Sequence, residues 1–479
     1  MARTADFRYM ELADSLESRI RQGSYRSGEK LPSIRQLHGH TGLSISTVYQ
    51  AFIELETRGL VQARPKSGYF VRPLLTGILP LPAPGKPASH PNPVTVGNLA
   101  LALLDAMGDP EMLQLGGALV APELLPAKDL ADVLKSIPLR SMGNMLAAYE
   151  NAQGNLELRR QIARRMLAAP LPSGPAEIVV THGCMEAVAL CLKAVAGSGD
   201  TIMVESPTFP WFLQVIEDLK MYALEVPTDC QTGIHLKAVA RALELHPVRA
   251  AVFMANFQNP SGYLMSDARK AQLVDLMSRH GVPVIEDDIY GDLHFGATRP
   301  RPLKAFDTKG EVLYCASFSK TMAPGLRVGW TAPGRYLEAV RRVKLNQSIA
   351  CPSLNQYQAA RYLGSGRFDR HLRKLRRALQ NQIANTALAV ARYFPAGTKI
   401  SAPQGGITLW VQLPSGVDSL ELFRQALDRK VAILPGVICS TGSAYRNCLR
   451  VSCGLPWSSR IEDGIQTLGE IIRKISSST

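Results

Sequence analysis

Lys320 is the residue whose neighbours most directly suggest chemistry. It follows the apolar run 312–316 and stands just after Ser317 and Ser319, with Arg327 seven residues further along the chain. A lysine amine attacks carbonyl carbons, and two hydroxyls with a guanidinium are suited to holding an anion. The stretch therefore predicts a site that can bind an anion, and the role of Lys320 depends on what the rest of the chain supplies.

Polar residues also follow several other strand-like runs, each at the point where the run ends. Because the carboxyl ends of parallel strands meet at one edge of a sheet, we expect these residues to come together there. A helix that begins near Gly183 adds free backbone N–H groups, which favour phosphate binding. The residues concerned are His182-Gly183-Cys184, Phe209, Asn259, Asp287 and Tyr290.

Pyridoxal phosphate is a ligand that needs all of these groups at once. We assign Lys320 to its aldehyde, as a Schiff base, and Asp287 to its ring nitrogen. Asn259 and Tyr290 are assigned to the phenolic oxygen, and Phe209 to a stacking contact with the ring. The phosphate group is assigned to Gly183, Cys184, Ser317, Ser319 and Arg327.

The elements that must position these residues alternate along the chain. Apolar runs of strand length are separated mostly by helical segments, which predicts a mainly parallel sheet with helices on both faces. The runs are 178–181, 201–205, 250–255, 282–286, 312–316 and 328–331. Toward the C-terminus, further runs alternate with helices and predict a smaller α+β unit, at 407–411, 431–434 and 449–453.

These motifs, in this order, resemble class I aminotransferases of the fold-type I group over residues 112–476. The resemblance implies a large part at about 145–345 and a small part at about 350–476. It also implies a homodimer in which Tyr149 reaches the phosphate of the partner subunit's site, and it implies that Arg450 binds a substrate carboxylate. The matching stretches are Asn259-Pro260-Ser261-Gly262, Asp287-x-x-Tyr290, 149–159, 317–329 and 448–452.

Two positions depart from the common pattern of that family. Cys184-Met185 stands where hydroxyl or amide side chains are frequent, and Phe209 stands where tyrosine is common. The first departure removes a contact to the phosphate, and the second removes a hydroxyl near the reacting centre. They therefore weaken the prediction of catalytic turnover more than the prediction of cofactor binding. No metal site is predicted.

Residues 1–72 have a different pattern, which predicts three helices followed by a two-stranded ribbon. The helices are predicted at 9–20, at 34–40 and from Ser44 or Ser46 to Arg58, and the strands at 60–64 and 69–71. The block resembles the winged helix-turn-helix domain of GntR-type bacterial regulators, on the stretches 31–37, 42–49, 55–60 and 66–71. The resemblance implies contacts with double-stranded promoter DNA from Arg35, Ser44, Ile45, Ser46, Thr47, Tyr49, Lys66 and Gly68.

Composition agrees with a nucleic-acid partner. The 479 residues include 54 Lys and Arg against 40 Asp and Glu, a net charge of +14. No apolar run approaches the ~20 residues of a membrane-spanning helix, the start lacks a signal-peptide core, and the eight cysteines form no CxxC pair. We therefore expect a cytoplasmic protein with no membrane partner. Seven prolines lie between Pro73 and Pro93, and we predict a linker over residues 73–111.

Over nearly its full length the chain resembles the MocR subgroup of GntR-type regulators. That resemblance implies a multidomain transcriptional regulator with little or no turnover. Its effector is then pyridoxal 5'-phosphate, or a small amino acid or amine that forms an external aldimine with it. Two alternatives stay open: an active amino acid aminotransferase with an accessory DNA-binding domain, and a sensor for which the cofactor is the only effector.

Overall fold

A computed structural model describes residues 5–22, 24–25, 29–58, 60–64, 67–71, 77–95, 101, 105, 108–171 and 173–477. Its residues form two compact units, of which the first extends to Ile78 and the second comprises Leu79–His294 and Arg299–Thr479. Lys66, predicted to contact DNA, lies outside the described residues. In the part of the chain that the structure describes, no helix is both long enough and apolar enough to cross a membrane.

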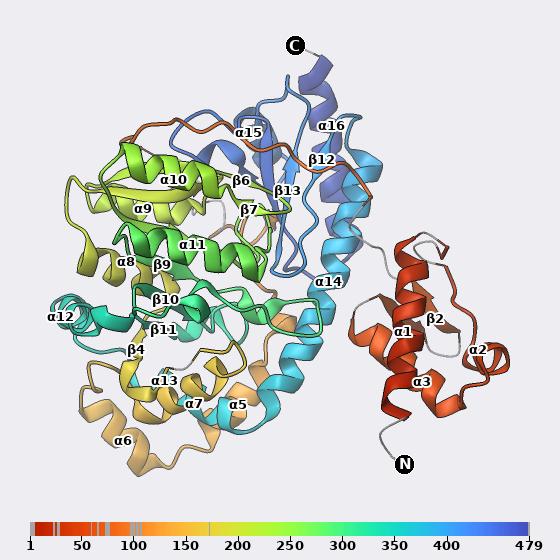
Figure 1. Cartoon of the computed structure of the whole chain (residues 1–479), viewed down its shortest axis with the longest axis horizontal. Helices are drawn as coiled ribbons and strands as arrows, with labels where there is room; N and C mark the ends of the chain where they lie inside the picture. The colour runs from red at the N-terminus through yellow and green to blue at the C-terminus, as the bar shows by residue number, and fades with distance from the viewer. Residues whose placement is uncertain are drawn as a thin grey trace. The chain divides into compact units, whose positions relative to one another are not determined.

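The first unit is a winged helix-turn-helix, as predicted from the sequence (Figure 1). Helix α2 begins after Ser33, whose hydroxyl accepts from the Gln36 N–H while the Gln36 side chain accepts from the Ser33 N–H. The turn to α3 is made by Gly42 at a φ of +67°, a conformation that favours glycine. Its elements are α1 (Ala5–Arg21), α2 (Ile34–Thr41), α3 (Ile45–Thr57), β1 (Val61–Arg64) and β2 (Gly68–Val71).

The second unit is built on an eight-stranded sheet with the order β4-β11-β10-β9-β8-β5-β6-β7. The central pairs from β10 to β6 are parallel, whereas β11 is antiparallel to both of its neighbours. The mainly parallel sheet is therefore confirmed. The strands are β4 (Val179–Thr181), β5 (Thr201–Ser206), β6 (Tyr222–Asp229), β7 (Gly233–Ile234), β8 (Val248–Phe253), β9 (Val284–Asp287), β10 (Val312–Ser317) and β11 (Gly329–Ala332).

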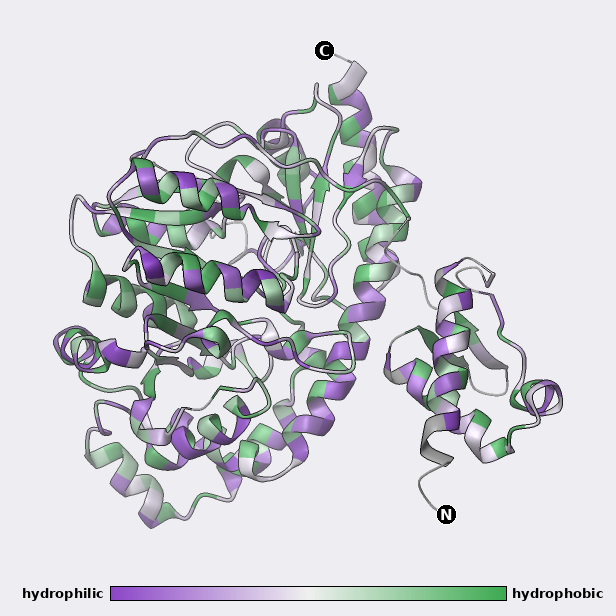
Figure 2. Ribbon diagram, viewed as in Figure 1, coloured by the Kyte–Doolittle hydropathy of each residue, from purple (hydrophilic) through white to green (hydrophobic). Residues whose placement is uncertain are grey.

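Helices cover both faces of this sheet. Neighbouring residues of β10 point to opposite faces and contact different helices. Tyr314 packs into a core cluster with residues of α7 and α13, while the Cys315 thiol on the other face lies 3.7 Å from that of Cys191 in α8. Figure 2 shows hydrophobic residues along the strands and hydrophilic residues on the outer sides of the helices. The helices of this part are α5 (Ala127–Lys135), α6 (Leu139–Ala147), α7 (Leu156–Met166), α8 (Cys184–Val195), α9 (Pro210–Asp218), α10 (Leu236–Leu245), α11 (Asp267–Arg279), α12 (Leu337–Ser348) and α13 (Ser353–Gly364).

A smaller part of the second unit contains the antiparallel sheet β12-β13-β16-β15 and three helices. The run 431–434 was predicted as one strand, and this is wrong. It divides into β14 (Val431–Ala432), which pairs with β3 (Leu113–Gln114), and β15 (Leu434–Pro435), which pairs with β16. The remaining elements are β12 (Lys399–Ile400), β13 (Thr408–Gln412), β16 (Cys448–Ser452), α14 (Arg367–Tyr393), α15 (Ser419–Asp428) and α16 (Ser459–Ser477).

Strand β6 was not predicted, because a glutamate and a proline interrupt its apolar pattern. In the structure, Glu225 is buried within this strand and its carboxylate accepts hydrogen bonds from Ser206, Ser440 and Thr441. Buried carboxylates are tolerated when several donors satisfy them. The donors come from β5 and from the small part, so only the tertiary structure supplies them.

The proline-rich segment is attached to the second unit along much of its length. The Pro80 carbonyl accepts from the Ile400 N–H at 2.9 Å, and the Ala83 N–H donates to the Gln412 side chain at 3.1 Å. Further on, Asn92 forms a two-way backbone pair with Ala223 of β6. We call residues 79–94 the strap, because they contact first the small part and then the large sheet.

Candidate functional site

Lys320 lies just beyond the carboxyl end of β10, at a cavity of about 320 Å³ between the large and small parts of the second unit. Its Nζ donates to the Ala118 carbonyl at 2.7 Å. Burial, together with the nearby Arg450 guanidinium, lowers the pKa of Lys320 to about 8. More of this amine is therefore unprotonated near neutral pH than in an ordinary lysine, and the unprotonated form is the one that attacks carbonyl carbons.

The cavity brings together most of the residues that the sequence assigned to one ligand. They come from the ends of β5, β8, β9 and β10, from the start of α8 and from β16 of the small part. The predicted residues that line it are Cys184, Phe209, Asn259, Asp287, Tyr290, Ser319, Lys320, Arg327 and Arg450.

Asp287 is buried at the end of β9 and accepts hydrogen bonds on one carboxylate oxygen. The donors are the Ile289 N–H at 2.9 Å and the Cys184 thiol at 3.2 Å. Burial raises the pKa of Asp287 to about 6. Its carboxylate thus stays mainly ionised at neutral pH and is suited to balance a positive charge placed in the cavity.

Asn259, Tyr290 and Arg450 form a connected polar chain on one side of the cavity. The Asn259 amide donates to the Tyr290 hydroxyl at 3.4 Å, and its carbonyl accepts from Arg450 Nη1 at 2.9 Å. Arg450 also donates to the Gly116 carbonyl. Its Nε is buried and has no partner among the described residues, so this guanidinium has capacity left for an anion.

The start of α8 and the Arg327 side chain form a concave, positively charged surface. Arg327 Nη2 donates to the His182 carbonyl at 2.6 Å, and a Cβ at Gly183 would lie 2.6 Å from the same nitrogen. A side chain here would therefore displace the guanidinium, and Gly183 also has a φ of +92°, which favours glycine. The Ser317 hydroxyl accepts a hydrogen bond from the Ser319 N–H at 3.3 Å.

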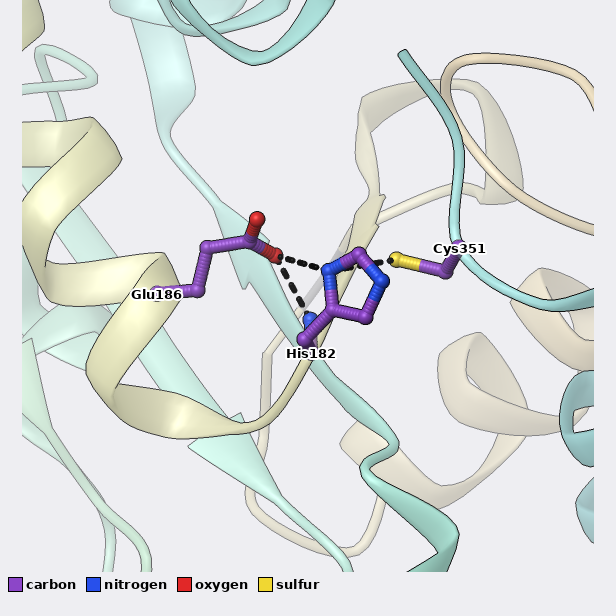
Figure 3. Close-up of side chains that lie close together, drawn as sticks. All are labelled: His182, Glu186 and Cys351. Carbon is purple, nitrogen blue, oxygen red and sulfur yellow. Dashed lines mark hydrogen bonds and ion pairs between the residues drawn. The ribbon is translucent and has the colours of Figure 1, made fainter. Parts of the chain in front are cut away.

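Beside this surface, the side chains of His182, Glu186 and Cys351 lie close together (Figure 3). His182 Nδ1 lies 3.0 Å from Glu186 Oε2 and 3.6 Å from the Cys351 thiol, and these contacts raise the pKa of His182 to about 9. Lys344 Nζ lies 3.3 Å from the same thiol and 3.9 Å from Glu186 Oε2. The His, Glu and Cys side chains are close enough to hold a metal ion, but the buried Lys344 ammonium already supplies a cation at this position.

Tyr149 does not join the cavity of its own chain. Its side chain is 85% exposed, just after α6, where Leu139 and Leu146 are also exposed. The cavity also has lining residues that the sequence reasoning missed. They are mostly apolar and include Gly116, Ala118, Leu119, Trp211 and Ile433. The glycine pair 116–117, close behind the short strand β3, could have indicated Gly116. Apolar residues of a cavity wall have no distinctive sequence pattern.

In the first unit, the N-terminal turn of α3 is exposed. Ser44 caps the helix by accepting from the Thr47 N–H at 3.1 Å, and Ile45 and Tyr49 are 53% and 49% exposed. Ser46 and the Arg35 side chain of α2 are exposed as well. This is the end of the helix that recognition helices present to base edges.

Comparisons with known proteins agree with both units. Residues 8–71 match the family model of bacterial regulatory proteins of the gntR family, and residues 122–460 match that of aminotransferases of class I and II. The chain is 38% identical to the uncharacterised HTH-type transcriptional regulator YjiR of Escherichia coli, over 97% of this chain and 98% of the relative. It is 37% identical to YdcR of the same organism, over 98% and 99% of the two chains.

Among solved structures, the second unit is similar to LysN, an α-aminoadipate aminotransferase of Thermus thermophilus. The TM-score is 0.73 at 28% identity, covering 79% of this chain and 95% of that one. The first unit therefore has relatives among DNA-binding regulators, and the second among aminotransferases. This chain belongs to the GntR-type transcriptional regulators in which a helix-turn-helix domain is fused to a class I/II aminotransferase domain, the MocR architecture.

Proposed function

We propose that this regulator adjusts its binding to promoter DNA in response to pyridoxal phosphate and to a small amino compound held at Lys320. The observation that carries the proposal is the convergence of Lys320, Asp287 and Arg450 on one cavity, in a chain that also has a DNA-binding unit. When bound, the cofactor supplies an aldehyde on which a primary amine replaces the lysine.

The side chains of the cavity match the parts of this cofactor. In the proposal, Asp287 balances the ring nitrogen, Asn259 and Tyr290 bind the phenolic oxygen, and Phe209 stacks on the ring. Ser317, Ser319, Arg327 and the N–H groups at Gly183 and Cys184 hold the phosphate. The partnerless Nε of Arg450 supports an effector carboxylate at that position. The Thermus relative was solved in complex with N-(5'-phosphopyridoxyl)-L-leucine, which also supports this match.

DNA recognition is proposed to use the exposed turn of α3 together with α2 and the ribbon. In the proposal, base edges are contacted by Ser44, Ile45, Ser46, Thr47 and Tyr49, because recognition helices present this end to the major groove. Arg35 contacts a phosphate, and Lys66 and Gly68 contact the minor groove. The exposure of Ile45 and Tyr49 supports this assignment, since isolated large apolar side chains gain from covering by a partner.

A homodimer is expected through the second unit, with Tyr149 completing the site of the partner subunit. The exposed side chains of Leu139, Leu146 and Tyr149 support an interface at and just after α6. Leu146→Glu should weaken dimerisation by roughly tenfold or more, since a buried leucine contributes about 1.5–3 kcal/mol. Sedimentation velocity measures this, with Leu245→Glu, a similarly exposed leucine at the end of α10, as the control. A parental protein that sediments as a monomer would contradict the interface.

The strap offers a route by which the cavity influences the DNA-binding unit. It is bonded to the small part at Pro80 and Ala83 and to the large sheet at Asn92, and it continues the chain from the end of the first unit. An effector whose carboxylate binds Arg450 of β16 connects the small part to Lys320 of the large part. Any shift between the large and small parts then moves the strap, which directly follows the DNA-binding unit in the chain.

The test of the proposal is reciprocity between the two ligands. A ligand shifts only states for which its affinity differs, and coupling energies are typically about 1–3 kcal/mol, or roughly fivefold to 150-fold in affinity. Operator DNA should therefore change effector affinity by the same factor by which effector changes DNA affinity. Titrations of the full chain by fluorescence anisotropy for DNA and by cofactor absorbance for the effector measure both factors.

Two variants separate DNA binding from the coupling between the two ligands. Arg35→Ala should weaken DNA binding and flatten its salt dependence while leaving the absorbance response unchanged, because a phosphate contact releases counterions. Gly85→Val should reduce the coupling, since a side chain at Gly85 collides with Tyr445 and displaces the strap. If effector affinity is the same with and without operator DNA, the result favours the alternative function, an aminotransferase that carries a passive DNA-binding unit.

A further inference from the structure

The cavity wall beyond the cofactor residues is apolar. Its lining there comes from the loop after β3, from α9, from the ends of β8 and β9, and from the segment between β14 and β15. Trp211 follows the proposed ring-stacking residue Phe209, and the two rings lie 6.0 Å apart. The apolar lining residues include Leu119, Trp211, Met254, Ile289, Ile433 and Leu434.

The charged side chains that line the cavity all have a use in the proposed function. Among the described lining residues, they are Asp287, Lys320, Arg327 and Arg450. Asp287 serves the ring nitrogen, Lys320 the aldehyde, Arg327 the phosphate and Arg450 the effector's α-carboxylate. The effector's amino group releases Lys320 when it replaces it. Apart from that amine, no cationic side chain of this lining is left to pair with a second carboxylate, and no anionic one is left to pair with a distal amine.

We propose that the effector is an α-amino acid with an uncharged, apolar side chain, aliphatic or aromatic, which packs against this wall. The proposal rests on the proposed function and names its ligand class. The amino group replaces Lys320, the α-carboxylate binds the free Nε of Arg450, and the side chain contacts residues such as Leu119 and Trp211. A dicarboxylic amino acid would bring its second charge against apolar atoms without a partner, which is unfavourable.

The test is a set of matched amino acids titrated into the full chain loaded with pyridoxal phosphate, followed by cofactor absorbance and by calorimetry. Leucine and aspartate form the central pair, because the aspartate carboxylate has the shape of the leucine isopropyl group. Leucine should bind at least about tenfold more tightly than aspartate. Along alanine, 2-aminobutyrate, norvaline and norleucine, affinity should rise about threefold to fourfold for each methylene.

A substitution in the wall should reverse this preference in a predictable direction. Leu119 is 43% exposed, so Leu119→Lys places an ammonium at the cavity where water still reaches it. The ratio of leucine to aspartate affinity should fall by at least about tenfold in this variant. Leu245→Lys, at an exposed leucine outside the cavity lining, should leave the ratio unchanged.

The outcomes separate this inference from the proposed function. Tighter or equal binding of aspartate or glutamate would overturn the apolar class and leave the proposed regulator intact. Affinity that is flat along the methylene series, or a ratio unchanged in Leu119→Lys, would also overturn it, because the side chain then does not contact this wall. If the loaded protein responds to none of these amino acids, the inference fails, whereas the proposed function fails only if no amino acid or primary amine changes the cofactor absorbance.

Discussion

Lys320→Ala protein, loaded with pyridoxal phosphate and reduced with borohydride, should retain no covalently attached pyridoxyl group. Lys320 is the only lysine among the described residues that line the cavity, and burial lowers its pKa to about 8. Two described lysines, Lys270 and Lys344, are fully buried, and they are bound elsewhere, to Asn256 and beside Cys351. Among the described lysines, Lys320 is therefore the one placed at the cavity to hold the aldehyde.

Peptide mapping by mass spectrometry gives the answer directly. Parental protein should give one labelled peptide that contains Lys320, and the variant none. Lys193→Ala, which removes a lysine that contacts Gln347 away from the cavity, should label like the parental protein. A labelled peptide elsewhere in Lys320→Ala, at the parental yield, would show that the lysine assignment is mistaken.

Asp287→Asn should weaken cofactor binding by about a hundredfold or more and slow the exchange of bound cofactor with amines. The asparagine keeps the shape of the side chain but removes the negative charge opposite the ring nitrogen. Removing one partner of a buried charge pair costs roughly 3–5 kcal/mol. Equilibrium dialysis measures the affinity, and stopped-flow absorbance measures the exchange rate.

The same carboxylate gives a pH dependence with a defined sign. Burial raises the pKa of Asp287 to about 6, so its charge is present above that pH and is lost as the pH falls through it. Cofactor affinity of the parental protein should therefore decline below about pH 6. In Asp287→Asn this step should be absent, while the thermal unfolding of the unloaded variant should match that of the parental protein. Exchange at the parental rate in the variant would assign the ring nitrogen to another group.

Both predictions rest on residues that the sequence alone identified. Lys320, Asp287 and Asn259 each stand within about four residues of the end of an apolar strand-like run, and the structure places them at one edge of one sheet. This was predictable because parallel strands present their carboxyl ends together, so chain order alone brings such residues near one another. The helix-turn-helix was also predictable from the sequence. Ser33 and Ser44 cap the starts of α2 and α3, and Gly42 caps the end of α2, so each acts on neighbouring residues.

Features that depend on contacts between distant segments were not predictable. Strand β6 contains Glu225, and only the hydroxyls of Ser206, Ser440 and Thr441 make its burial tolerable. The run 431–434 is apolar throughout, and its division between two sheets depends on β3, more than three hundred residues earlier. The strap has the composition of a free linker, yet its backbone groups find partners in Ala223 and Ile400.

The sequence by itself thus determined the order of most elements, the polar groups predicted for the site and the presence of a helix-turn-helix unit. These follow from short-range patterns, in which capping, periodicity and the position after a strand depend on neighbouring residues. The tertiary structure alone decided that Arg450 bonds to Asn259 and keeps a free Nε, and that apolar side chains occupy the rest of the cavity wall. Such side chains look like core residues in a sequence, and only packing decides which of them face a ligand.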